Sequence, residues 1–74
     1  MELFYTPNTI SVVVAIALEE AGIAYTLRLV DFATGEQTKE PYLTLNPKGR
    51  VPALVTPNGT LTEAGAILDY IGTM

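Results

Sequence analysis

The sequence contains neither cysteine nor histidine. The absence of cysteine excludes disulfides, thiolate metal ligands and any redox step that uses a thiol of the protein itself. The absence of histidine excludes histidine-based acid–base catalysis, and the two absences together exclude zinc-finger ligation. No metal or other cofactor is therefore expected, and any thiol chemistry needs a thiol that a ligand brings.

Basic residues are also few. Four stand against eight acidic residues, which gives a net charge of −4 and argues against a nucleic-acid partner. Three of the four, Lys39, Lys48 and Arg50, nevertheless fall within one short window. This window is either a solvated loop or an anion-binding segment.

No long hydrophobic run is present. Residues 10–18 are apolar but too short to span a bilayer. They also lack the features of a signal peptide, because the only charge before them is Glu2 and because Glu19 and Glu20 follow without a cleavage site. The sequence predicts one small domain over residues 1–74, in the cytoplasm and without a membrane segment.

The first half of the chain has the pattern of a strand, a helix and a second strand. Residues 2–5 are rich in apolar and aromatic side chains, and Pro7 and Asn8 end this segment. Apolar residues then recur with helical spacing at Ile10, Val13, Val14, Ala17, Leu18 and Ala21. Asn8 or Thr9 can serve as the N-cap, and Gly22 fits the position after the helix. Residues 25–31 alternate as a strand does, so the unit is a right-handed crossover between parallel strands.

The second half predicts a loop, a short helix, a hairpin and a last helix. Residues 32–39 are a polar loop around Gly35, and residues 41–45 can form one or two helical turns. Strands at 53–56 and 60–62 flank Asn58-Gly59, a strong hairpin signal. Thr62 is expected to cap a helix with the apolar positions Ala64, Ile67, Leu68 and Ile71. The order β-α-β-α-β-β-α predicts an α/β fold with a mixed four-stranded sheet flanked by helices.

This order, with "NPKGRVPAL" at residues 46–54 and "LTEAGAILDYI" at residues 61–71, resembles the N-terminal, thioredoxin-like domain of cytosolic glutathione transferases. The bacterial beta-class branch is most similar. The resemblance covers the whole chain, and the all-helical C-terminal domain of that family has no counterpart in it. It implies a glutathione site and, in the full-length protein, a homodimer.

The resemblance implies where glutathione binds. Pro52 is expected to follow a cis bond, so that the backbone N–H and C=O of Val51 pair with the cysteinyl part of the ligand by strand addition. Glu63 is expected to meet the ligand's ammonium group, and the N–H of Ala64 its γ-glutamyl carboxylate at the start of the last helix. Relatives commonly have serine at position 64, so one hydrogen bond is lost here.

Two bases are candidates for the glycyl carboxylate of glutathione. Arg50 stands beside Val51, and a guanidinium can bind a carboxylate with two donors. Lys39 is the second candidate, whereas Lys48 is expected to be solvated. Without the resemblance, each of these residues can equally be an ordinary surface charge.

In the beta class, a cysteine occupies the position of Ile10, which cannot perform thiol chemistry. Thr9 is our first candidate for the hydrogen bond to the glutathione thiolate, because Ile10 is expected to point to the core. Ser11 is the second candidate and Tyr5 the third, and Asn8 is a further polar group. A hydroxyl and a helix N-terminus both favour thiolate over thiol.

The predicted function is that of a glutathione transferase domain, an enzyme module that activates glutathione for attack on an electrophile. The sequence does not identify this electrophile, and the 74-residue chain alone is expected to turn over little. The alternative is a non-catalytic binding or structural module of the same fold. A glutaredoxin-like oxidoreductase is excluded, because it requires a cysteine in the first helical turn.

Overall fold

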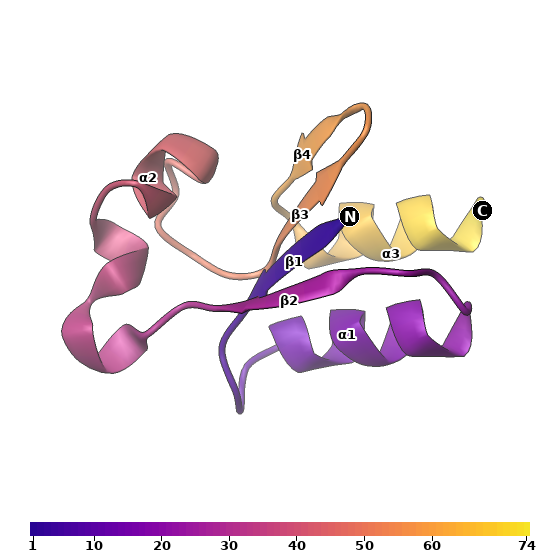
Figure 1. The fold of residues 1–74 in the computed structure, drawn as a ribbon, viewed down its shortest axis with the longest axis horizontal. Coiled ribbons are helices and arrows are strands. Elements are labelled where there is room, and N and C mark those ends of the chain that lie inside the picture. The colour runs from indigo at the N-terminus through magenta and orange to yellow at the C-terminus, as the bar shows by residue number, and fades with distance from the viewer.

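The computed structural model describes all 74 residues as a four-stranded sheet with helices on both faces (Figure 1). The elements are β1 (Glu2–Tyr5), α1 (Ser11–Glu20), β2 (Thr26–Leu29), 3₁₀ turns at Phe32–Thr34 and Glu36–Thr38, α2 (Tyr42–Leu45), β3 (Ala53–Thr56), β4 (Gly59–Leu61) and α3 (Ala64–Gly72). The strand order is β2-β1-β3-β4. β1 and β2 are parallel, and the other two pairs are antiparallel, so the mixed sheet is confirmed.

Side chains alternate across the sheet and build two apolar layers. The larger layer lies between the sheet and the helices α1 and α3, which run side by side (Figure 1). Its buried members are Leu3, Val14, Leu18, Leu54, Ile67 and Ile71. The smaller layer, on the α2 face, consists of Val30, Tyr42 and Ala53, with Phe4 packed against it. The helical stripe predicted for α1 therefore holds at Val14 and Leu18, whereas Ile10, Val13 and Ala21 are exposed.

The expected helix starts were wrong in detail. α1 has Ile10 as its N-cap residue instead of Asn8 or Thr9, and Ile10 has no polar side chain to cap it, although Thr9 Oγ1 accepts from the Ser11 N–H at 3.2 Å. Ile10 does not point to the core, because 55% of its surface is exposed. α3 has Glu63 as its N-cap residue, again without a side-chain cap, so Thr62 does not have the expected role.

The expected turns are found where backbone conformation demands them. Gly22 has a φ of 69° after α1, and Gly59 has a φ of 124° in the hairpin, where β4 begins one residue earlier than expected. Gly35, with a φ of 73°, joins the two 3₁₀ turns that replace the expected loop. The Val51–Pro52 bond is cis, as expected, and Glu40–Pro41 is a second cis bond that the sequence analysis did not anticipate. None of the helices has the length and apolar character needed to cross a membrane.

Candidate functional site

A cavity of about 250 Å³ opens where β1 and β2 end and where the chain enters β3. Because β1 and β2 are parallel, their C-terminal ends lie side by side, so the segments that follow the two strands meet there. The cavity is lined by Thr9, Phe32, Gln37, Gly49, Arg50 and Val51. We call it the Thr9 cavity. It brings together Thr9, Arg50 and Val51 from the set of site residues that the sequence predicted.

Buried hydrogen bonds fix the loop that carries Arg50 and Val51. Asn46 is fully buried, and its Nδ2 donates to the Arg50 carbonyl oxygen at 2.7 Å. Its Oδ1 accepts from the Lys48 N–H at 3.1 Å. The Tyr42 hydroxyl donates to the same Arg50 oxygen. Burial raises the pKa of Tyr42, which keeps the phenol protonated and able to donate.

Val51 presents an unpaired stretch of backbone to the Thr9 cavity. The ladder of β3 starts only at Ala53, which pairs with Phe4. The N–H and C=O of Val51 form no backbone hydrogen bond in the fold, and Pro52 has no N–H to offer. This edge can therefore accept an extended peptide through backbone hydrogen bonds.

A compact cluster of hydroxyls supports the turn between β1 and α1. Thr9 Oγ1 lies 2.7 Å from the Thr6 carbonyl oxygen and 2.5 Å from Ser11 Oγ. Ser11 Oγ accepts the Thr6 N–H at 3.0 Å and lies 3.1 Å from the Thr6 carbonyl oxygen. Either hydroxyl can thus donate to the Thr6 carbonyl. If Ser11 does so, the hydrogen of Thr9 becomes available to a group in the cavity.

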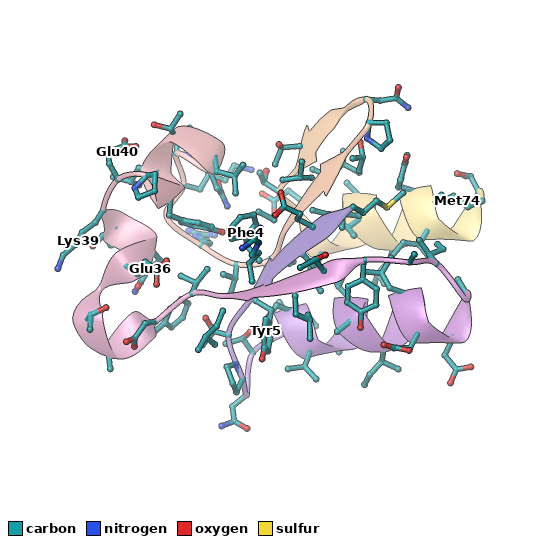
Figure 2. The ribbon with its side chains drawn as sticks, viewed as in Figure 1. Phe4, Tyr5, Glu36, Lys39, Glu40 and Met74 are labelled. Carbon is teal, nitrogen blue, oxygen red and sulfur yellow. The ribbon has the colours of Figure 1, made fainter.

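The structure separates the three hydroxyl candidates. Thr9 is half-buried and lines the Thr9 cavity, whereas Ser11 is fully buried beneath it. Tyr5 packs against the core layer of α1 and α3 and does not line the cavity; Figure 2 shows it on the α1 side of the sheet. The geometry therefore does not support a direct role for Tyr5. The roles of Thr9 and Ser11 stay predictions.

Gln37 is a cavity residue that sequence reasoning missed. It lies in the second 3₁₀ turn, and its side-chain Oε1 is buried without a hydrogen-bond partner. Gly49 allows this close approach, since a Cβ atom there would lie 3.0 Å from the Gln37 carbonyl oxygen. The positive φ of Gly49, 65°, also favours glycine. No local signal in the sequence indicated that the segment around Gly49 would meet Gln37.

The three clustered bases do not share one target. Arg50 lines the cavity and joins neither of the two ion pairs in the structure. Lys39 is not in the cavity: its Nζ donates to the Thr34 carbonyl oxygen at 2.8 Å, and Figure 2 shows the side chain pointing away from the sheet. Lys48 is not simply solvated, because it forms an ion pair with Glu63.

Glu63 and Ala64 lie at the start of α3, linked to the cavity loop by Lys48. The hydrogen bond and the positive charge of Lys48 lower the pKa of Glu63, with a smaller contribution from Arg50. The first intrahelical bond runs from the Ile67 N–H to the Glu63 carbonyl, and no side chain caps the helix. The N–H of Ala64 is therefore free to bind an anion.

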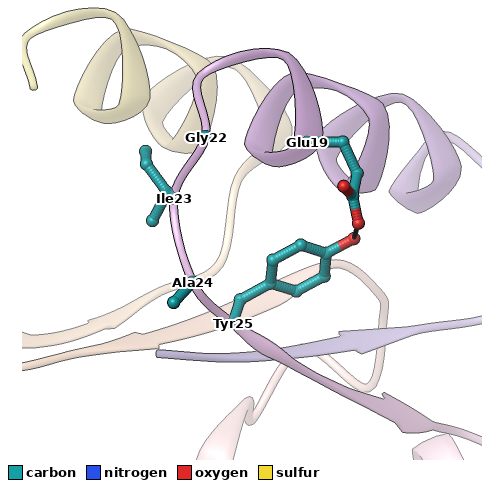
Figure 3. A pocket seen from close by; sticks show the side chains of 5 residues that line it. All are labelled: Glu19, Gly22, Ile23, Ala24 and Tyr25. Atoms are coloured by element: carbon teal, nitrogen blue, oxygen red, sulfur yellow. Dashed lines mark hydrogen bonds between the residues drawn. The ribbon is translucent and has the colours of Figure 1, made fainter.

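A larger cavity, of about 350 Å³, lies at the opposite end of the strands, between the end of α1 and the start of β2 (Figure 3). The Tyr25 hydroxyl donates to Glu19 Oε1 at 2.8 Å across it. Burial and this acidic partner raise the pKa of Tyr25. No basic residue lines this cavity, so it does not offer the charges that a peptide carboxylate would need.

The fold and the Thr9 cavity together define a thioredoxin-like domain with a stretch of unpaired backbone beside a cavity. The sequence profile described as "Glutathione S-transferase, N-terminal domain" matches residues 1–73. Glutathione S-transferase GstA of Escherichia coli O157:H7 is 42% identical over 73 residues, which cover 96% of this chain and 36% of that protein. The chain therefore belongs to the glutathione S-transferase family, within which it corresponds to the N-terminal domain.

Two solved structures support this assignment. A glutathione transferase homologue from Sulfitobacter, solved with bound glutathione, is 59% identical with a TM-score of 0.94, over 97% of this chain and 35% of that one. The beta-class enzyme of Sphingomonas chungbukensis is 47% identical with a TM-score of 0.86, over 99% of this chain and 37% of that one. The chain thus spans about a third of the length of these relatives.

Proposed function

We propose that the protein binds glutathione in the Thr9 cavity and activates its thiol for attack on an electrophile. The observation that carries the proposal is the unpaired backbone of Val51, held beside Thr9 by the buried hydrogen bonds of Asn46. A backbone edge binds a peptide, and a neighbouring hydroxyl gives its sulfur a hydrogen-bond donor. Relatives solved with glutathione bound support the choice of ligand.

In this arrangement the cysteinyl backbone of glutathione pairs with Val51. The glycyl carboxylate lies toward Arg50, whose guanidinium has no protein partner. Gln37, with its unpartnered Oε1, can accept from an N–H of the ligand. The γ-glutamyl end lies at the start of α3, with its ammonium at Glu63 and its carboxylate at the N–H of Ala64.

The sulfur lies against Thr9 and loses its proton to water when it reacts. The Thr9 hydroxyl then donates to the thiolate, while Ser11 replaces Thr9 as donor to the Thr6 carbonyl. A hydrogen bond to a charged group contributes about 1.5–3 kcal/mol. At 1.36 kcal/mol per pKa unit, this hydrogen bond lowers the thiol pKa by about 1–2 units.

The activity of the whole protein is also part of this proposal. The electrophile is not identified by any residue of the Thr9 cavity, and the 74-residue chain is expected to bind glutathione but to turn over little. A role in detoxification, a cytoplasmic location and a homodimer are parts of the same proposal, taken from the family resemblance. The alternative, a module that binds glutathione without activating it, differs in the state of the bound thiol.

The test measures the pKa of the glutathione thiol when bound, by ultraviolet thiolate absorbance across a pH series. We expect a value below that of free glutathione. Thr9→Ala should raise the bound value by about 1–2 units, and Thr9→Ser, which keeps the hydroxyl, should restore most of the shift. If glutathione binds with an unshifted thiol pKa, the protein is a binding module. If calorimetry detects no binding, the proposed site is wrong.

A further inference from the structure

The base that the sequence left unassigned lies against the acid expected to bind the ligand's ammonium. Lys48 Nζ contacts Glu63 Oε1, although 15 residues separate the two in the chain. The side chains are 50% and 63% exposed, so a solute can reach both. The pair connects the loop of the Thr9 cavity to the first turn of α3.

The backbone holds Lys48 in this place. Its N–H is bound by the buried Asn46 side chain, and Gly49 turns the chain immediately after it. Only the flexible part of the Lys48 side chain is free to move. Lys48 can therefore leave Glu63 without any change in the loop that carries Arg50 and Val51.

We propose that Lys48 is an internal counter-ion that competes with the ammonium group of the ligand for Glu63. The inference rests on the proposed glutathione site and concerns its specificity. In the free protein Lys48 already neutralises the Glu63 carboxylate. An incoming ammonium group first meets a neutral ion pair. It experiences the full charge of Glu63 only after Lys48 has moved away, so Lys48 lowers the affinity for ligands with a free amino group.

Two physical points support competition over simple coexistence. Oε2 of Glu63 has no hydrogen-bond partner and could accept a second cation, but Lys48 would then repel the ammonium at short range. Glu63 also has no other cationic partner within ion-pair distance, since the second ion pair of the structure joins Arg28 to Glu2. The charge of Glu63 is thus shared between Lys48 and the ligand.

The size of the effect follows from the exposure of the pair. Because water and salt screen an exposed ion pair, we expect its removal to change the affinity by no more than about fivefold. Lys48→Met keeps the aliphatic length of the side chain and removes the charge. We expect this substitution to tighten glutathione binding by about two- to fivefold at low ionic strength.

The experiment compares three ligands by calorimetry at neutral pH. Glutathione carries both the ammonium and the carboxylate at its γ-glutamyl end. 4-Aminobutyryl-Cys-Gly keeps only the ammonium, and glutaryl-Cys-Gly keeps only the carboxylate. Lys48→Met should tighten binding of the first two ligands and should not tighten binding of the third.

Two matched variants separate competition from the general loss of a positive charge. Arg28→Met breaks the exposed ion pair between Arg28, on the edge strand β2, and Glu2. It should slightly weaken the binding of all three ligands or leave their binding unchanged. In a Glu63→Gln background, Lys48→Met should no longer tighten binding of either ammonium ligand, because the carboxylate for which Lys48 and the ammonium compete is absent.

The outcomes are distinct from those that test the proposed function. Absence of glutathione binding to the unmodified protein would overturn both proposals. If glutathione binds and Lys48→Met weakens the binding of glutathione and of glutaryl-Cys-Gly alike, Lys48 binds the carboxylate of the ligand and the competition is refuted. Equal effects of Lys48→Met with and without Glu63 would refute it as well.

Discussion

The carbonyl oxygen of Arg50 accepts from two buried donors, and this sharing has a measurable consequence. Tyr42→Phe removes the phenol donor but leaves the Asn46 amide at 2.7 Å, so it should cost about 0.5–1.5 kcal/mol. Asn46→Ala removes two hydrogen bonds and should cost about 1–3 kcal/mol. The double variant leaves the carbonyl without either donor. It should be less stable than the sum of the single effects by about 1 kcal/mol.

Urea denaturation followed by far-ultraviolet circular dichroism measures these differences. The chain has no tryptophan, and Tyr42→Phe alters tyrosine fluorescence, so the backbone signal is the appropriate probe. In a domain of this size, 1 kcal/mol corresponds to a change in melting temperature of roughly 4–8 °C. Tyr25→Phe is the matched control, because it removes a phenol that donates to an exposed carboxylate at the opposite end of the strands.

The binding of glutathione gives an independent readout of the same coupling. If the shared carbonyl positions Val51, the double variant should lose more affinity than the two single variants together. Strict additivity in both stability and affinity would show that the two donors do not act through one carbonyl. The proposed role of this loop in holding the Val51 edge would then be wrong.

Other substitutions test separate features of the site. Ala64→Ser supplies the hydroxyl that the family resemblance leads us to expect and should tighten glutathione binding, measured by calorimetry, by about 0.5–1.5 kcal/mol. Ile10→Ala should change the free energy of unfolding by no more than about 0.5 kcal/mol, because Ile10 is exposed. Gly49→Ala should cost about 1–3 kcal/mol, because its φ is 65° and the new Cβ atom would meet a carbonyl oxygen at 3.0 Å. Lys48 lowers the pKa of Glu63 below its ordinary 4.5, so the stability that their pair contributes is complete above that value and is lost as the pH falls through the lowered pKa. The Lys48→Met variant should lack this acid-side loss in urea titrations.

The fold was largely predictable because its signals are local. The helical spacing of Val14 and Leu18 and the Asn58-Gly59 hairpin each depend on neighbouring residues alone. The start of α1 was wrong because Thr9 is not its N-cap residue: Thr9 Oγ1 bonds the Thr6 carbonyl oxygen as well as the Ser11 N–H, and Ser11 Oγ bonds the backbone of Thr6. Local composition does not reveal which backbone group a hydroxyl will choose.

The candidate site was predictable only in part. The motif around Val51 indicated a stretch of backbone open to a ligand. In the structure this backbone is unpaired and lines the same cavity as Thr9, which lies in the turn after β1. Gln37 was missed because its place in the cavity depends on two consecutive 3₁₀ turns and on the close approach of Gly49. Tertiary contacts of this kind, between segments distant in the sequence, leave no periodic pattern of residues from which they could be predicted.

The basic window shows why charge spacing alone is a weak guide to a binding site. Lys39 lies before the turn at Asn46 and bonds a carbonyl oxygen of its own segment, while Lys48 lies within the turn and reaches α3. Only Arg50 follows the turn and lines the Thr9 cavity. The loop therefore distributes three neighbouring charges in three directions. An anionic ligand in the Thr9 cavity meets one uncommitted guanidinium, which can bind a carboxylate with two donors, instead of three cations whose attraction would be strong but non-directional.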